Sequence, residues 1–191
     1  MSCSINPNRR KVKRNDPPGN IFLVGFMGSG KSTVGPIIAS ISSRGFIDTD
    51  ALIERAEGVS IGQIIKAHGE PRFRALELKA IERACAMQNV VVSTGGGSVL
   101  DGENVFNMRN SGTVVWLNCP PEVIYERVKN DNSRPLLQVN DKLSTIREIL
   151  SCRELIYRRA AHVIVNCESK KPFRIAREAC NLVRQRRATQ L

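Results

Sequence analysis

The chain of 191 residues contains few aromatic residues and only two histidines, His68 and His162. Its six cysteines are scattered without C-x-x-C spacing, and neither histidine lies near a cysteine pair, so a structural zinc site is not expected. A chain of this length does not need disulfide bonds to hold its core together. We therefore expect free thiols in a reducing compartment and a cytoplasmic location.

Long apolar runs are also absent. No stretch of 18 apolar residues occurs, so we expect no membrane partner. Residues 1–19 carry five Lys and Arg residues but no apolar segment of the kind that a secretory signal requires. We expect these residues to form a disordered basic leader. A short targeting leader is the alternative.

The net charge of +11 is concentrated at the ends of the chain. Residues 1–19 and residues 174–191 each carry +4, which leaves +3 for the rest of the chain. This balance is typical of a protein that binds small anions, whereas a nucleic-acid-binding protein usually has a basic stripe across its body and aromatic residues for stacking. Solvated tails explain the basic ends, and we expect no nucleic-acid partner.

The hydrophobic pattern predicts one α/β domain over residues 20–187, followed by a tail at 188–191. Short apolar, β-rich runs alternate with stretches of helical periodicity, which predicts a parallel sheet with helices on both faces. The predicted strands lie at residues 21–24, 46–47, 90–92, 113–117 and 162–165. The predicted helices lie at residues 33–43, 51–56, 61–67, 70–87, 121–129, 142–159 and 172–187.

The most specific motif is the phosphate-binding loop, Gly25 to Ser32, which matches G-x-x-x-x-G-K-[ST] directly after the first predicted strand. Glycines allow backbone N–H groups to approach phosphate oxygens where a Cβ atom would clash. Lys31 supplies charge for the β- and γ-phosphates, Ser32 offers a hydroxyl to Mg²⁺, and the helix dipole favours the anion. The pattern therefore predicts an ATP site formed by Gly28, Ser29, Gly30, Lys31, Ser32 and Thr33.

Two acidic residues follow the second predicted strand. Asp48-Thr49-Asp50 lies at the carboxyl edge of the sheet, where open α/β sheets bind ligands. If the chain is extended there, the two carboxylates point the same way. One of them can then face a metal ion and the other an acceptor hydroxyl. A solvated acidic turn is the alternative.

Further motifs come later in the chain. The triple glycine Gly95-Gly96-Gly97 follows the third predicted strand and permits a close approach of backbone amides to a small polar ligand. A polar, turn-rich segment at residues 130–141 has the composition of a mobile lid. Arginines lie in three of the surrounding segments: Arg74 in the Gly69 to Glu77 segment, Arg134 in the lid and Arg153 on the helix after it.

Together these motifs resemble shikimate kinase. The match extends over about residues 20–180, and the motifs occur in the family's order: the phosphate-binding loop, Asp48-Thr49-Asp50, Gly-Glu-x-x-Phe-Arg-x-x-Glu at Gly69 to Glu77, the triple glycine, Arg-Pro-Leu-Leu at Arg134 to Leu137, and Arg153 with Tyr157. The resemblance implies the P-loop kinase fold, with a five-stranded parallel sheet flanked by helices and a mobile lid.

The resemblance also implies a role for each matching residue. Asp50 would bind the acceptor hydroxyls and act as the base, while Asp48 and Ser32 would hold Mg²⁺. Arg74 and Arg153 would bind the shikimate carboxylate. The remaining assignments are Gly95, Gly96 and Gly97 for the ring hydroxyls, Arg134 for the γ-phosphate and the acceptor, and Arg127 and Pro172 for the two faces of the adenine.

The sequence thus predicts an ATP- and Mg²⁺-dependent kinase that phosphorylates the 3-hydroxyl of shikimate, acting as a monomer with Lys31, Asp50 and Arg134 as its catalytic residues. Two alternatives remain open. Another small-molecule kinase with this fold would share the loop and the sheet. A non-catalytic relative would lack Lys31, Asp50 or one of the carboxylate-binding arginines, and none of these residues is missing.

Overall fold

The computed structural model describes residues 19–131, 137–168 and 170–189. Residues 1–18 of the predicted leader, the centre of the predicted lid with Arg134, and the last two residues of the tail lie outside these ranges. The strands are β1 (Asn20–Val24), β2 (Gly45–Asp48), β3 (Val90–Ser93), β4 (Gly112–Asn118) and β5 (Val163–Asn166). The helices are α1 (Lys31–Ser42), α2 (Thr49–Glu57), α3 (Ile61–Cys85), α4 (Gly102–Ser111), α5 (Pro121–Val128), α6 (Lys142–Ala160) and α7 (Pro172–Ala188), with a 3₁₀ turn at Ser98–Leu100.

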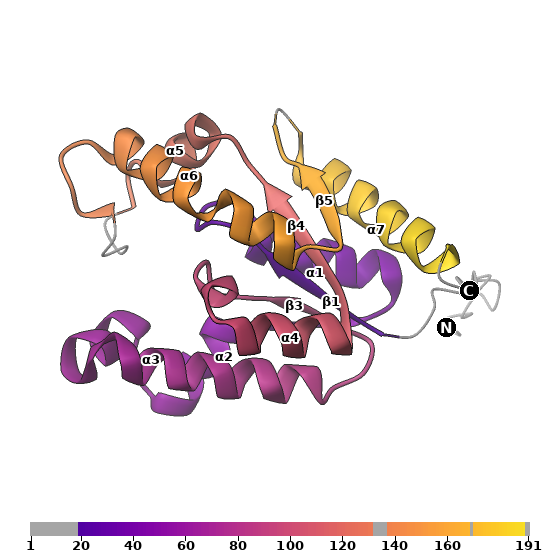
Figure 1. The fold of residues 1–191 in the computed structure, drawn as a ribbon, viewed down its shortest axis with the longest axis horizontal. Helices are drawn as coiled ribbons and strands as arrows, with labels where there is room; N and C mark the ends of the chain where they lie inside the picture. Colours follow the sequence, from indigo (N-terminus) through magenta and orange to yellow (C-terminus); the bar gives the residue numbers. More distant parts are fainter. Residues whose placement is uncertain (1–18, 132–136, 169, 190–191) are drawn as a thin grey trace, which may run out of the picture.

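The five strands form one parallel sheet (Figure 1), as the sequence predicts. Their order in the sheet is β2-β3-β1-β4-β5. Every residue of β1 is buried, because helices cover both faces of the sheet. Since all strands run the same way, their carboxyl ends meet at one edge. The phosphate-binding loop, Asp48 and the triple glycine therefore all emerge at that edge.

Alternate residues of β1 belong to two separate apolar clusters. Ile21 and Leu23 pack in the cluster that includes residues of α1 and α7. Phe22 and Val24 pack in the cluster that includes residues of α3, α4 and the C-terminal part of α6. The sheet is thus the middle of three layers (Figure 1), and its rigid carboxyl edge carries the loops described below.

Two elements differ from the sequence prediction. Helix α4 was not predicted, because its sequence is polar and only Asn104 and Met108 are buried, so it shows no apolar periodicity. Asp101 begins this helix by accepting hydrogen bonds from the backbone of residues 103 and 104. The predicted helices at 61–67 and 70–87 are the two halves of α3, separated by Gly69 with φ 79°. Pro71 lies in the first turn after that break, where its missing N–H costs little.

None of the helices among the described residues is both long enough and apolar enough to span a bilayer. The five cysteines in the described ranges are free thiols, as the sequence predicts: Cys85, Cys119, Cys152, Cys167 and Cys180.

Candidate active site

The phosphate-binding loop connects β1 to α1, and its glycines are required by the backbone. Gly25 has φ 144°, and a Cβ atom there would lie 2.8 Å from the carbonyl oxygen of Leu117. Gly28 and Gly30 have φ values of 76° and 97°, in the region that favours glycine. Gly30 caps α1, so the N–H groups of the helix's first turn are directed at the loop. The predicted anion site is therefore present as backbone geometry.

Lys31 places its ammonium group inside this loop. The side chain is buried, and Nζ donates to the carbonyl oxygens of Gly25 at 2.6 Å and Phe26 at 3.0 Å. Ser29 Oγ is also buried and has no hydrogen-bond partner within the described part of the chain. A buried hydroxyl without a partner is unfavourable unless a ligand satisfies it. The loop thus contains the positive charge of Lys31 and a hydroxyl, that of Ser29, which a ligand could satisfy.

Asp48 and Asp50 lie beside the loop, but they are not arranged as predicted. The strand ends at Asp48 and helix α2 begins at Thr49, so the segment is not extended through Asp50. The prediction failed because Asp48 caps the helix, accepting from the backbone N–H groups of Asp50 at 3.1 Å and Ala51 at 3.3 Å. The other oxygen of Asp48 accepts a 2.8 Å hydrogen bond from Ser32 Oγ. Asp48 and Ser32 therefore form one polar pair.

Asp50 lies in an environment that disfavours its charge. Burial is the largest cause, and the neighbouring charge of Asp48 adds to it, so that the pKa of the Asp50 carboxyl is raised from 3.8 to about 6 despite the opposing charge of Lys31. Its Oδ1 atom is buried and has no hydrogen-bond partner among the described residues. A carboxylate with a pKa close to neutral and a free oxygen is suited to accept a proton from a ligand.

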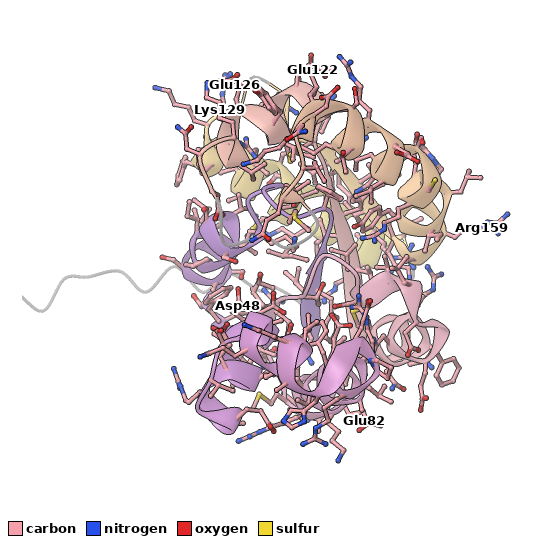
Figure 2. The ribbon with its side chains drawn as sticks, turned by 90° about the vertical axis from the view of Figure 1, so that its left-hand side faces the viewer. Asp48, Glu82, Glu122, Glu126, Lys129 and Arg159 are labelled. Atoms are coloured by element: carbon pink, nitrogen blue, oxygen red, sulfur yellow. The ribbon has the colours of Figure 1, made fainter. Side chains whose placement is uncertain are left out.

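A cavity of about 740 Å³ joins these groups. The predicted residues that line it are Gly28, Ser29, Gly30, Lys31, Ser32, Thr33, Asp48, Asp50, Gly96, Arg127 and Pro172. Figure 2 shows Asp48 in the interior of the view, whereas Glu122 and Glu126 of α5, and Lys129 directly after it, lie at the outer edge of the molecule. The predicted nucleotide-binding residues are thus brought together at the carboxyl edge of the sheet.

Arg127 contacts the phosphate-binding loop directly. Its Nη1 atom donates to the carbonyl oxygens of Gly28 at 3.0 Å and Ser29 at 3.1 Å. Pro172 is the first residue of α7 and lines the same cavity. Arg127 therefore ties helix α5 to the loop, a contact that the sequence did not predict.

The triple glycine forms the turn after β3, where other parts of the site approach its backbone closely. A Cβ atom on Gly97 would lie 2.8 Å from Arg74 Nη1, and one on Gly95 would lie 2.5 Å from Glu77 Oε1. A Cβ atom on Gly96 would lie 3.1 Å from the backbone nitrogen of Met27 in the phosphate-binding loop. The turn thus lies between the nucleotide cavity and helix α3.

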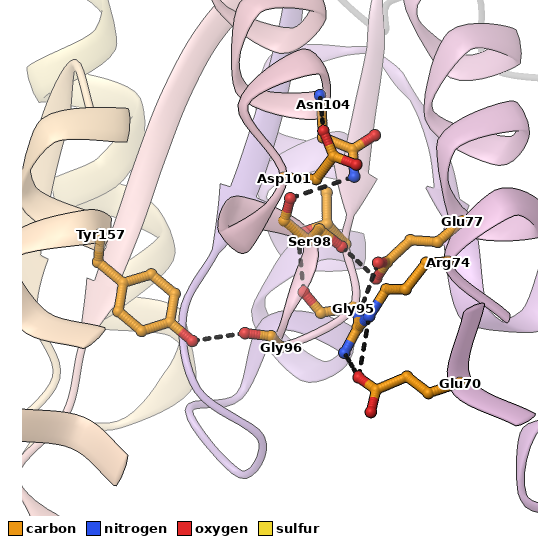
Figure 3. Close-up of polar contacts among 10 residues, drawn as sticks. Glu70, Arg74, Glu77, Gly95, Gly96, Ser98, Asp101, Asn104 and Tyr157 are labelled. Carbon is orange, nitrogen blue, oxygen red and sulfur yellow. Dashed lines mark hydrogen bonds and ion pairs between the residues drawn. The ribbon is translucent and has the colours of Figure 1, made fainter. Parts of the chain in front are cut away.

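Arg74 lies against this turn, held by two glutamates (Figure 3). Its guanidinium is 2.7 Å from Glu77 and 2.6 Å from Glu70. Glu77 is buried and also accepts a 2.6 Å hydrogen bond from Ser98, whereas Glu70 is exposed. An exposed ion pair contributes about 0 to 1 kcal/mol. Glu70 can therefore be exchanged for another carboxylate at little cost, while Glu77 keeps Arg74 in place.

Arg153 lies on α6, four residues before Tyr157 on the same helix face. Its positive charge and its hydrogen bond to the Tyr157 phenol both oppose the rise in the pKa of that phenol. The Tyr157 hydroxyl donates to the Gly96 carbonyl oxygen at 2.5 Å (Figure 3). The structure thus brings Arg74 and Arg153 to the same glycine turn, although neither lines the 740 Å³ cavity.

Several site residues were missed by sequence reasoning. Ser93, at the end of β3, places its hydroxyl 3.4 Å from that of Ser32. Its signal was a polar residue at the carboxyl end of a buried strand. Glu54 lines the cavity from α2, with no signal apart from helical spacing. Within the described ranges, no group of three or more acidic, histidine or cysteine side chains could hold a metal ion by itself.

The comparisons with known proteins agree with this geometry. The family model for shikimate kinase matches residues 27–184. The shikimate kinase of Persephonella marina is 46% identical over 165 residues, covering 86% of this chain and 99% of that protein. The shikimate kinase of Nitrosococcus oceani is 41% identical, covering 87% of each chain.

Solved structures give the same result. The shikimate kinase from Acinetobacter baumannii, in complex with shikimate, superposes with a TM-score of 0.83 at 34% identity, covering 86% of this chain and 92% of that one. The enzyme from Aquifex aeolicus gives 0.74 at 37% identity, covering 85% and 95%. A gluconokinase from Sinorhizobium meliloti, at 0.56 and 19% identity over 90% and 97%, shares the fold alone. The chain belongs to the shikimate kinase family.

Proposed function

We propose that this kinase transfers the γ-phosphoryl group of ATP to the 3-hydroxyl of shikimate, giving shikimate 3-phosphate and ADP. The observation that carries the proposal is the single cavity that joins a phosphate-binding loop to a carboxylate with a raised pKa, beside a glycine turn with two arginines. Phosphoryl transfer depends on positioning and charge neutralisation more than on covalent chemistry, so this arrangement suits the reaction.

The nucleotide would bind at the phosphate-binding loop. The backbone N–H groups from Gly28 to Thr33 would donate hydrogen bonds to the phosphate oxygens. The Ser29 hydroxyl, which has no partner among the described residues, would donate another. Lys31 would exchange its loop carbonyls for β- and γ-phosphate oxygens, which are stronger acceptors because they are charged. Arg127 and Pro172, which line the same cavity, would contact the adenine.

Ser32 and Asp48 would hold Mg²⁺. A hydroxyl and a carboxylate oxygen, already 2.8 Å apart, are the hard oxygen donors that this ion prefers. Two protein ligands fit Mg²⁺, because the ion normally takes its remaining positions from phosphates and water. When bound, the ion supplies charge neutralisation on the phosphate oxygens.

The acceptor would lie between Asp50 and the glycine turn. Asp50 would accept the proton of the 3-hydroxyl, and Gly95, Gly96 and Gly97 would contact the ring hydroxyls through their backbone. Arg74 would exchange exposed Glu70 for the substrate carboxylate, and Arg153 would bind it from α6. Both arginines would thus fix the ring with its hydroxyl near Asp50.

The lid at residues 130–141 would close over the bound substrates and bring Arg134 to the γ-phosphate, excluding water that competes as an acceptor. Arg134 lies outside the described residues. At the base of the segment, Leu137 is buried in the core beside α1 and α7. A closing segment would therefore begin from a fixed point.

We propose a cytoplasmic monomer that acts on small molecules, without nucleic-acid or membrane partners. Support for a reducing compartment comes from the free thiols in the described ranges. The concentration of basic charge at the two ends of the sequence, without a basic stripe along the rest of the chain, supports the absence of a nucleic-acid partner.

The test is a coupled assay of ADP release with shikimate and quinate in parallel, each with and without Mg²⁺. We expect ADP release that requires both shikimate and the metal ion, with a product phosphorylated at the 3-hydroxyl by NMR. Quinate measures how strictly the ring is selected. ATP binding without ADP release would identify a non-catalytic relative. Release with another polyol and none with shikimate would identify a different small-molecule kinase.

A further inference from the structure

Tyr157 has a hydroxyl that the packing of its ring does not need. The ring is fully buried and stacks on Trp116, with centroids 5.6 Å apart and planes 12° apart. A phenylalanine would fill the same space in this apolar cluster. The hydroxyl instead leaves the cluster and donates to the Gly96 carbonyl oxygen at 2.5 Å (Figure 3), which is short for a bond between neutral groups. The function of the hydroxyl therefore concerns Gly96.

Gly96 is the middle residue of a turn in which three consecutive glycines have no side chains to restrict the backbone. Backbone hydrogen bonds from Ser98 to Gly95 and from Leu100 to Gly97 restrain the turn, but neither involves Gly96, so contacts from outside help to fix that residue. On the α3 side, Ser98 donates to the buried Glu77 at 2.6 Å, and Glu77 holds Arg74. On the α6 side, the described contact to the turn is the Tyr157 hydroxyl. The turn is thus fixed from both neighbouring helices.

The position of Gly96 matters for both halves of the site. Its backbone lies against Met27 of the phosphate-binding loop, where a Cβ atom would come within 3.1 Å. It also lines the cavity that Asp50 faces. Arg153, one helical turn before Tyr157, belongs to the same helix face. A shift of the turn relative to α6 would therefore change the distance between the ring-binding backbone and Arg153.

We propose that Tyr157 is a positioning residue for the acceptor substrate: its hydrogen bond fixes the Gly96 carbonyl relative to helix α6, so that the glycine turn and Arg153 form one surface for shikimate. This inference rests on the proposed function. Burial raises the pKa of Tyr157 to about 12 even though Arg153 opposes the shift, so the phenol remains a donor throughout the neutral range. Tyr157 does not itself line the nucleotide cavity, and it contacts the lining at Gly96, which belongs to the turn assigned to the acceptor, so its effect should fall on the acceptor.

The test is Tyr157→Phe, which removes the hydroxyl and keeps the ring. We expect the KM for shikimate to rise roughly three- to ten-fold, the factor that the loss of one neutral hydrogen bond predicts. The KM for ATP should stay within about two-fold, since the phosphate-binding loop keeps its own contacts. Amide hydrogen exchange of residues 94–98, followed by mass spectrometry, should become faster in the variant.

Two controls separate positioning from packing. Tyr125→Phe is the same substitution at the other tyrosine of the chain, and it should leave both KM values unchanged. Tyr125 is partly buried against the apolar cluster that includes residues of α1 and α7. Trp116→Phe loosens the ring stack while keeping the Tyr157 hydroxyl, and it should lower the melting temperature with a smaller effect on the shikimate KM than Tyr157→Phe.

The inference is overturned if Tyr157→Phe leaves the shikimate KM unchanged, if both KM values rise equally, or if Trp116→Phe raises the shikimate KM as much. Failure of the proposed function is a distinct outcome. In that case wild type would release no ADP with shikimate, while the hydrogen-exchange comparison would still report whether the hydroxyl fixes the turn. Unchanged exchange in that comparison would overturn the positioning role as well.

Discussion

Asp50→Asn should stabilise the protein while it abolishes turnover. The pKa of the Asp50 carboxyl is raised from 3.8 to about 6, chiefly by burial and then by the charge of Asp48. Because one pKa unit corresponds to ~1.4 kcal/mol, ionised Asp50 lowers the free energy of unfolding by about 3 kcal/mol at neutral pH. The asparagine keeps the shape of the side chain and removes the charge, so this penalty should disappear.

The sign follows from proton binding. Between pH 3.8 and about 6, the folded protein holds a proton on Asp50 that the unfolded chain has lost. The contribution of Asp50 to stability is thus fully present below pH 3.8, and it is lost as the pH rises through about 6. The gain of the variant over wild type should be largest above about pH 7 and shrink to about 1 kcal/mol near pH 4.5.

Chemical denaturation of both proteins at several pH values measures this difference, and single-turnover rates measure the loss of the base. For a chain of this size, a gain of about 3 kcal/mol corresponds to a rise in melting temperature of roughly 6 to 12 °C. Asp101→Asn is the matched control, since asparagine caps a helix as well as aspartate does. An equal gain at all pH values, or an Asp50→Asn variant that is less stable than wild type above pH 7, would refute the reasoning.

Three further changes test other parts of the site and the core. Arg127→Lys should raise the KM for ATP several-fold and leave the KM for shikimate nearly unchanged, because lysine lacks the planar guanidinium that would stack on the adenine. Steady-state kinetics with each substrate varied would detect an equal effect on both KM values, which contradicts the role. Arg74→Lys should lower kcat/KM for shikimate roughly ten- to hundred-fold, the effect of losing one charge-assisted hydrogen bond to a carboxylate, and it should lose proportionally less with a neutral amide analogue of shikimate. Burial, with the charges of Arg109 and Arg186, lowers the pKa of His162 from 6.5 to about 4, so the free energy of unfolding should fall as the pH decreases from 6.5 to about 4. His162→Asn should weaken this pH dependence in denaturation curves, and an unchanged dependence would contradict the assignment.

The sequence was sufficient to predict most of the fold. The central strands β1, β3 and β4 are buried, continuous apolar runs, and the edge strands β2 and β5, although partly exposed, still show short apolar runs in the sequence. Helix α4 escaped prediction because it is held by the Asp101 cap and by a few buried residues rather than by an apolar face. The break within α3 is the converse case. The sequence pattern predicted separate helices on its two sides, and the structure shows that the break is at Gly69, in a conformation that glycine adopts most easily.

The nucleotide half of the site was easier to predict than the acceptor half. The phosphate-binding loop is contiguous, and its glycines, Lys31 and Ser32 act through local backbone geometry that a short motif specifies. The acceptor half is assembled from α3, the glycine turn and α6, so its contacts join residues up to 61 positions apart in the sequence. Such contacts depend on tertiary packing. The order of the motifs alone predicted a site role for Arg74. Its two ion pairs, with Glu70 and with Glu77, became visible only in the structure.

The distribution of unpartnered polar atoms indicates which part of the fold is shaped for a ligand rather than for stability. Asn20, buried at the amino end of β1, makes hydrogen bonds with both its amide nitrogen and its oxygen. Within the described ranges, four buried side-chain atoms have no partner, and three of them belong to Ser29, Thr49 and Asp50 at the carboxyl edge of the sheet. Each such atom costs about 1 to 3 kcal/mol in the free protein. A ligand that supplies partners to these atoms at the carboxyl edge of the sheet removes that cost when it binds. The unpartnered atoms at this edge therefore contribute to the free energy of ligand binding.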